Sequence, residues 1–228
     1  MPFVTLPRLV LLHGSVTGAS RSWRRQEPLR ERFELVTPAR PGFWPNPPVE
    51  RVDFERDAAW LPSIVEPGDH LVGHSYGGVA ALLAAPTLPL ASLTVIEPPA
   101  FGVARGEPSV ESWLERAAAL PSGEIDAFLE LVGAPFRMPN PPPGDLRQGA
   151  EAFFSERRPQ EAEIPLLPLP YPVLVVTGAH EQAFEAVGDV LERSLGAERV
   201  VLPGAGHAVQ NAPGFNEALT AFTARKAP

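Results

Sequence analysis

Cysteine is absent from this chain of 228 residues. The sequence therefore excludes a disulfide framework, a Cys-ligated zinc site and a thiol nucleophile. Lysine is nearly absent too, with one lysine against 18 arginines, and the 27 acidic residues leave a net charge of −8. Nucleic acid and anionic membranes need a basic surface, so this charge disfavours both as the main partner.

Long apolar runs are missing as well. No stretch approaches the roughly 18 uninterrupted apolar residues of a membrane span, and residues 1–8 lack the charged and then apolar segments of a signal peptide. We therefore expect a cytoplasmic protein whose partner is a small-molecule substrate. The oligomeric state is not indicated by any of these features.

Basic residues gather in one place only, and acidic residues interrupt them there. We interpret this cluster as a solvated helix face. Its arginines are Arg21, Arg24, Arg25, Arg30 and Arg32.

Short apolar runs alternate with helical patterns along most of the chain. Strands are expected at 9–12, 34–37, 71–72 (leading into the turn at Ser75), 93–96, 173–176 and 200–202, and helices at 22–33 (interrupted by Pro28), 53–65, 79–85, 183–195 and 213–225. This alternation predicts an α/β fold with a mostly parallel sheet and helices on both faces. The length fits one such core, made of residues 1–100 and 171–228.

Residues 101–170 break the alternation. They are helical in pattern around 109–119, 123–132 and 145–157. A helical insertion between two strands would lie as a cap over the strand ends. Its apolar side chains could line a pocket, although for any single one packing against the core is the simpler interpretation.

The segment 73–78, Gly-His-Ser-Tyr-Gly-Gly, lies between an apolar strand and an apolar helix. A serine on so sharp a turn needs small residues two positions to either side, and Gly73 and Gly77 supply them. The following helix would direct its free N–H groups toward the reaction centre. This context predicts that Ser75 is a nucleophile.

A serine hydroxyl needs a positioned base, and His207 is the best candidate. It follows the last expected strand and is preceded by Gly206, so it falls at the same edge of the sheet as Ser75. The oxyanion formed in acyl transfer needs two N–H donors. We expect them to be the backbone amides of Tyr76, after the nucleophile, and of Ser15, after the first strand.

At this point the chain resembles the α/β-hydrolase superfamily over nearly its whole length. The matching pieces are His13-Gly14, the turn at 73–78, the helical insertion, Thr177-Gly178 and Gly206-His207. The resemblance implies the chain order Ser, acid, His. It also implies a compact sheet of about six strands that lacks the first two of larger members, in the superfamily's strand order 4-3-5-6-7-8.

The acidic residue of the triad matches the superfamily pattern less closely. Most members carry an aspartate three residues after the glycine that follows the penultimate strand, and Glu181 stands there. A minority place the acid after the preceding strand, where Glu97 stands. Glu97 ends a strand that should be buried, so its carboxylate needs a partner such as His207. Both residues stay candidates for the triad acid, with a slight preference for Glu97. Asp189, on a predicted helix surface, is a third candidate.

The predicted function is that of a serine hydrolase acting on an ester or related acyl bond through a Ser-His-Glu triad, without a metal or organic cofactor. Other reactions use the same triad, namely cleavage of carbon–carbon bonds or thioesters, and perhydrolysis. The dehalogenase branch uses aspartate where Ser75 stands. A catalytically silent binding protein is the alternative from another class.

Overall fold

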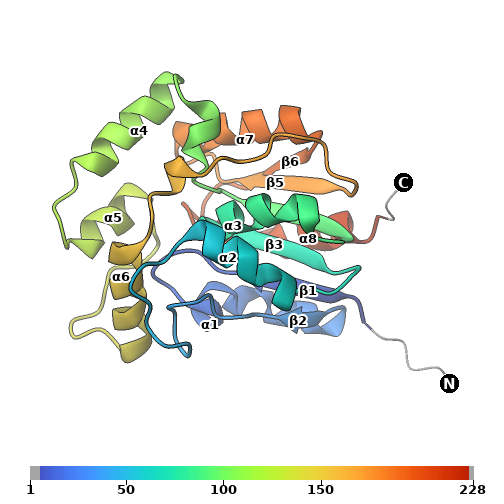
Figure 1. Cartoon of the computed structure of the whole chain (residues 1–228), viewed down its shortest axis with the longest axis horizontal. Helices are drawn as coiled ribbons and strands as arrows, with labels where there is room; N and C mark the ends of the chain where they lie inside the picture. Colours follow the sequence, from blue (N-terminus) through green and yellow to red (C-terminus); the bar gives the residue numbers. More distant parts are fainter. Residues whose placement is uncertain (1–5, 226–228) are drawn as a thin grey trace.

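Residues 6–225 are described by the computed structural model (Figure 1). Within them, six strands form one sheet in the order β2-β1-β3-β4-β5-β6, and every neighbouring pair is parallel. The strands are β1 Arg8–Leu12, β2 Glu34–Val36, β3 His70–His74, β4 Ser92–Ile96, β5 Val173–Thr177 and β6 Glu198–Val201. The predicted parallel sheet of about six strands is confirmed.

Helices connect the strands. The α-helices of the described residues are α1 Ala19–Ser22, α2 Phe54–Trp60, α3 Tyr76–Ala84, α4 Pro108–Ala118, α5 Ile125–Leu131, α6 Gly144–Ser155, α7 Gln182–Leu195 and α8 Phe215–Thr223. Short 3₁₀ helices are η1 Arg24–Glu31, η2 Leu61–Ser63, η3 Ala85–Thr87, η4 Phe101–Ala104, η5 Pro159–Glu161 and η6 Val209–Asn211. None of the helices in this part of the chain is both long and apolar enough to cross a membrane.

The sheet is covered on both faces, as the strand sequences predict. Successive side chains of a strand point to opposite faces. In β1, Val10 and Leu12 pack in a core shared with α2, α3 and α7, whereas Leu9 and Leu11 pack in a core shared with α1, η1 and α8. Because all four side chains are fully buried, the strand has to be apolar from Leu9 to Leu12.

Local sequence explains two of the connecting helices. Helix α2 begins after Asp53, whose carboxylate accepts a hydrogen bond from the Glu55 N–H at 2.8 Å, as an N-cap should. Residues 24–31 form the 3₁₀ helix η1 instead of the α-helix that the pattern over 22–33 suggests. Pro28 lies inside this segment and has no N–H to donate to an α-helical ladder.

The segment 101–170 lies between β4 and β5 in the chain and contains the three expected helices, α4, α5 and α6. Figure 1 shows them together at one end of the sheet, away from the N-terminus. Helix α4 packs against α7, and an isolated bridge joins Glu156 to Val52 of the core. The segment therefore lies where a cap would lie; its division from the core as a separate unit stays a prediction.

Candidate active site

Ser75 stands on the turn between β3 and α3. Its backbone has φ 53°, a left-handed conformation that a non-glycine residue rarely adopts. The turn brings the chain back on itself so closely that a Cβ at Gly73 would lie 2.7 Å from the Gly77 carbonyl oxygen, and one at Gly77 would overlap the His13 carbonyl. Side chains at these two positions would force the turn open, as the sequence motif predicts.

His207 lies in the loop after β6 and reaches the Ser75 side chain. The His207 Nε2 atom and the Ser75 Oγ atom are 2.8 Å apart, and both residues are 8% exposed. Gly206, with φ 54°, lets the loop pass tightly against residue 133, because a Cβ at 206 would overlap the Gly133 carbonyl. The imidazole can therefore accept a proton from the serine hydroxyl without further movement.

Glu97, directly after β4, is fully buried and makes the next contact. Its Oε2 atom lies 2.8 Å from His207 Nδ1, and its Oε1 atom accepts a hydrogen bond from the Gly178 N–H at 2.8 Å. An ionised carboxylate can only accept, so Nδ1 must carry the proton and Nε2 is free to accept from Ser75. The arrangement is a continuous chain from carboxylate to imidazole to hydroxyl.

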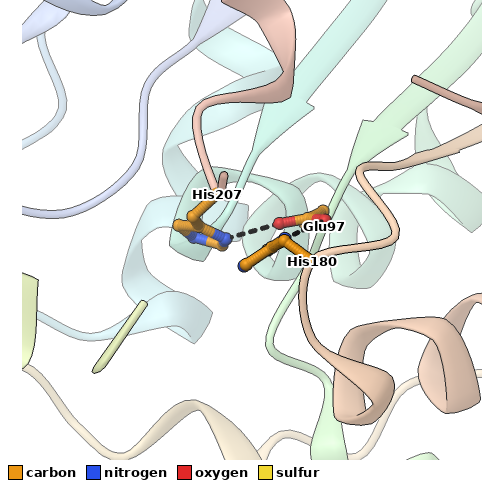
Figure 2. A group of neighbouring side chains, drawn as sticks. All are labelled: Glu97, His180 and His207. Atoms are coloured by element: carbon orange, nitrogen blue, oxygen red, sulfur yellow. Dashed lines mark hydrogen bonds and ion pairs between the residues drawn. The ribbon is translucent and has the colours of Figure 1, made fainter. Parts of the chain in front are cut away.

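The charge of Glu97 is maintained by its neighbours. Burial raises the pKa of its carboxyl, but the contacts with His180 and His207 outweigh burial and lower the pKa to about 2. His180 Nδ1 lies 3.2 Å from the Glu97 Oε1 atom, in ion-pair range but not aligned for a hydrogen bond. Figure 2 shows dashed lines from the Glu97 carboxylate to both imidazoles, which come from different loops.

Those three side chains also include the atoms that could bind a metal ion. Glu97, His180 and His207 each offer one ligand atom, and these atoms lie within 4.8 Å of one another. The hydrogen bond between His207 and Glu97 already uses one such nitrogen and a carboxylate oxygen. In the structure, His207 Nδ1 and Glu97 Oε2 are joined by this hydrogen bond at 2.8 Å.

The second candidate acid, Glu181, is not brought to His207. It is the N-cap residue of α7, and its carboxylate pairs with Arg116 at 2.6 Å. Asp189 lies on α7 and pairs with Arg199 instead. Because the chain turns away after His180, the position three residues beyond Gly178 faces α4 rather than the serine.

The two predicted oxyanion donors flank Ser75. Tyr76 N–H is the first amide of α3, and Ser15 follows the loop glycine Gly14, where a Cβ would lie 2.8 Å from the Ser75 Cβ. No backbone acceptor is found for either amide within residues 6–225. Free N–H groups at a helix start and on an adjacent loop can stabilise an oxyanion.

A buried ion-pair network supports the loop that carries Ser15, and sequence reasoning missed it. The Arg40 guanidinium, 0% exposed, donates to Asp57 at 2.7 Å and to the Gly14 carbonyl at 3.0 Å, and its NH2 lies 3.4 Å from Glu156. The Ser15 hydroxyl donates to Glu156 at 2.6 Å. Arg40 lies in a loop rich in proline and glycine, and Glu156 is 116 residues away in sequence, so no local pattern connects them.

A cavity of about 430 Å³ opens in front of Ser75 and His207. Part of its lining is apolar and comes from the segment 101–170, namely Phe128, Leu129, Val132, Phe136 and Leu146. The volume is in the range of small-molecule sites. A compound of moderate size can therefore reach the serine hydroxyl.

A parallel sheet with a serine on its central strand-to-helix turn, a histidine after the last strand and a buried acid between them defines the α/β-hydrolase architecture. Comparison with models of protein families agrees: residues 9–216 match the alpha/beta hydrolase family. The chain belongs to this family. A search of curated proteins finds no significant match.

Solved structures similar to this chain cover almost all of it. The lipase-esterase related protein from Clostridium acetobutylicum is 14% identical with a TM-score of 0.72, covering 96% of this chain and 95% of that chain. NosK from Streptomyces actuosus is 22% identical with a TM-score of 0.67, covering 95% of this chain and 97% of that chain. An epoxide hydrolase from metagenomes of hot environments is 18% identical with a TM-score of 0.72, covering 96% and 91%. At these identities the likeness supports the fold alone.

Proposed function

We propose that this protein is a serine hydrolase that cleaves an ester or a related acyl bond of a small, largely apolar substrate. The observation that carries the proposal is the hydrogen-bond chain from Glu97 through His207 to Ser75, with both links at 2.8 Å. Membership of the alpha/beta hydrolase family supports hydrolysis as the class of reaction.

In the first half of the proposed reaction, the Ser75 oxygen attacks the acyl carbon and its proton moves to His207 Nε2. The oxyanion that forms accepts hydrogen bonds from the Ser15 and Tyr76 amides. Glu97 stabilises the imidazolium through the Nδ1 hydrogen bond. The tetrahedral species collapses when His207 returns the proton to the leaving oxygen, which leaves an acyl-enzyme.

In the second half, a water molecule replaces the leaving group beside His207. The imidazole takes a proton from the water, whose oxygen attacks the acyl carbon, and the same two amides stabilise the new oxyanion. Return of the proton to Ser75 Oγ releases the acid and restores the enzyme. Each bond formed is matched by one broken, and no cofactor takes part.

The first test compares Ser75→Ala with the wild-type protein on p-nitrophenyl butyrate. We expect turnover to fall by at least about 10³-fold, since the nucleophile is lost while the rest of the site remains. Labelling by a fluorophosphonate probe should disappear in the same variant. The matched control is Ser63→Ala, because the Ser63 hydroxyl is exposed and donates only to the Trp60 carbonyl.

Retained ester hydrolysis in Ser75→Ala would refute the assignment of the nucleophile. Labelling of the wild-type protein without ester turnover would favour another reaction on the same triad, such as cleavage of a thioester or a carbon–carbon bond. If the wild-type protein is neither labelled nor active, the chain is better explained as a binding protein with a hydrolase fold. If the wild-type protein hydrolyses p-nitrophenyl butyrate, a series of p-nitrophenyl esters of graded chain length would define the acyl group that it prefers.

A further inference from the structure

Arginine dominates the charged lining of the cavity in front of Ser75. Arg21, Arg24, Arg25 and Arg137 line it, and none of the lining residues, all from the described part of the chain, is an aspartate or a glutamate. This local excess of positive charge contrasts with the net charge of −8 of the whole chain. Three of these arginines, Arg21, Arg24 and Arg25, belong to the basic cluster that the sequence suggests is a solvated helix face. Arg24 and Arg25 are exposed, as that interpretation predicts, and they also line the cavity.

Two of these four arginines are already neutralised by acidic partners. Arg21 donates to both oxygens of Asp145, at 2.5 and 3.2 Å, and Arg137 lies 3.5 Å from Glu130. Arg24 and Arg25 are different. Within residues 6–225, neither has a carboxylate at ion-pair distance, and neither guanidinium donates a side-chain hydrogen bond. Their charge is available to a ligand.

The backbone that carries Arg24 and Arg25 is fixed beside the catalytic loop. Gln26, fully buried, donates to the Gln210 carbonyl at 2.7 Å and to Asn216 at 3.0 Å. Asn216 in turn donates to the Arg25 carbonyl at 2.9 Å. Helix η1 is thus attached to the segment that follows His207, so the backbone at Arg24 and Arg25 keeps a defined place relative to the proposed base.

A second, more open cavity of about 470 Å³ continues from the first. The two cavities share Arg24, Arg25, Gln210 and Asn211 as lining residues. The arginines therefore lie where the two meet, between an apolar interior formed by the segment 101–170 and the open surface. A ligand with an apolar part inside and an anionic part at the mouth would satisfy both surroundings.

We propose that Arg24 and Arg25 bind an anionic group of the substrate, so that the enzyme acts on acyl compounds that join an apolar part to a carboxylate or a similar anion. This proposal rests on the hydrolase function proposed above and narrows its substrate class. Guanidinium groups bind carboxylates through paired, charge-assisted hydrogen bonds. Two arginines without a carboxylate partner at the cavity mouth also favour the approach of an anionic substrate, although Glu217 lines the more open cavity beside them.

The test compares neutral and anionic esters of matched size in the Arg24→Gln/Arg25→Gln double variant. One pair, p-nitrophenyl pentanoate and mono-p-nitrophenyl glutarate, carries the charge on the acyl side. The other pair, 3-acetylphenyl butyrate and 3-(butyryloxy)benzoate, carries it on the leaving group. We expect kcat/KM of at least one anionic ester to fall by about tenfold or more, while the neutral esters change by less than about twofold.

Salt provides a second readout. Raising ionic strength from about 0.01 M to about 0.15 M shortens the screening length from about 30 Å to about 8 Å. The wild-type kcat/KM for the sensitive anionic ester should fall over this range, and the double variant should lose that dependence. Arg32→Gln is the matched control, because Arg32 directly follows η1, is exposed and does not line either cavity.

Binding separates failure of this proposal from failure of the hydrolase function. Calorimetry with hexanoate and with 1-hexanol on the Ser75→Ala protein measures anion recognition without turnover. Weaker hexanoate binding in the Ser75→Ala protein that also carries the two Arg→Gln changes, with unchanged hexanol binding, supports the anion site whatever the reaction is. Equal losses for neutral and anionic compounds, or no loss for either, would overturn it even if Ser75 is confirmed as the nucleophile.

Discussion

At the scale of single residues, the Glu97 carboxylate makes contacts on both of its oxygens. One oxygen faces His207, and the other accepts from the Gly178 N–H and lies beside His180. A fully buried carboxylate with these partners is ionised at neutral pH, because its pKa lies near 2. Its effect on Ser75 is exerted through the tautomer of the His207 ring.

Replacing Glu97 with glutamine tests this role. We expect Glu97→Gln to lower kcat by about 10³- to 10⁴-fold, because an amide N–H facing His207 Nδ1 would favour the tautomer with a proton on Nε2, which cannot accept from Ser75. Ester hydrolysis by the purified variant is the measurement. Circular dichroism and a thermal melt would show whether the variant is folded.

Glu181→Gln is the matched control for Glu97→Gln. Its carboxylate pairs with a partly exposed arginine, a contact of the kind worth about 0–1 kcal/mol, so activity should stay within about twofold of the wild-type value. The opposite ranking of the two variants would move the proposed acid to the loop after β5. If both variants keep the wild-type activity, neither carboxylate takes part in the mechanism.

Sequence reasoning could locate Ser75 and His207 because each is marked by neighbours in the chain. The glycines at 73 and 77 make the turn recognisable, and Gly206 precedes the histidine directly after a strand. The expected burial of Glu97 at a strand end favours it over Glu181 only slightly, because which carboxylate reaches His207 depends on how two loops bend. Arg40 was not predicted at all, since its partners come from other elements and its burial is visible only in the folded chain.

At the scale of elements, helix α6 packs unusually closely on the loop that carries the Ser15 amide. A Cβ at Gly149 would overlap the carbonyl oxygen of Val16. Val16 itself has φ 65°, a conformation that a β-branched residue rarely adopts. Contact between helix and loop therefore depends on the absence of a side chain at position 149, and the loop geometry depends on that contact.

Gly149→Ala should displace this loop. Alanine favours the helix by up to about 1 kcal/mol, so α6 itself should not weaken. The added methyl group would push the Val16 carbonyl and move the Ser15 amide away from the oxyanion, and we expect kcat/KM for a small ester to fall by about 10- to 100-fold. Steady-state kinetics together with the melting temperature measure both effects.

Gly144→Ala is the control within the same helix, since a Cβ at Gly144 meets nothing within 4 Å. It should leave kcat/KM unchanged. If Gly149→Ala behaves in the same way, the loop is not held in place by α6, and the Ser15 amide is positioned by the Arg40 and Glu156 contacts alone.

Strands and helices were predictable where a single periodicity extends over the whole element. The helices at 108–118, 125–131 and 144–155 agree closely with the predicted ranges, because apolar residues recur there at helical spacing. Helix η1 was not predictable as a 3₁₀ helix. Its position beside the segment after His207 comes from the Gln26 and Asn216 hydrogen bonds, which join residues about 190 positions apart.

At the scale of the whole molecule, two neutral histidines buried beneath the site link stability to pH. His13 donates from Nδ1 to the Gly14 carbonyl and accepts the Arg40 N–H at Nε2, so a second proton has no acceptor. Burial, with the nearby Arg40 charge, lowers the pKa of His13 to about 3. Burial also lowers the pKa of His74 to about 3, with His207 adding to the effect.

Glu156 affects the pH dependence of stability in the opposite direction. Burial raises the pKa of its carboxyl to about 7, against the stabilising contacts with Arg40 and Ser15. Between the ordinary value near 4.5 and this raised value, the folded state binds a proton that the unfolded state does not. Its contribution to stability is therefore lost as pH rises, whereas that of each buried histidine is lost as pH falls below about 6.5.

The sum of these three groups predicts the slope of stability against pH. Between about pH 6.5 and 4.5 the two histidines outweigh Glu156 by one proton, so these three groups lower the free energy of unfolding by about 1.4 kcal/mol for each pH unit of acidification. Burial also lowers the pKa of His70, which makes the fall steeper. In Glu156→Gln the opposing group is gone, and the slope should be steeper by about 1.4 kcal/mol for each pH unit. Urea unfolding followed by tryptophan fluorescence at a series of pH values measures both slopes.

A flat profile in the wild-type protein would mean that the histidines become protonated without unfolding. Equal slopes in the two proteins would mean that Glu156 is ionised in the folded state, and that the loop carrying Ser15 is attached by a full ion pair with Arg40.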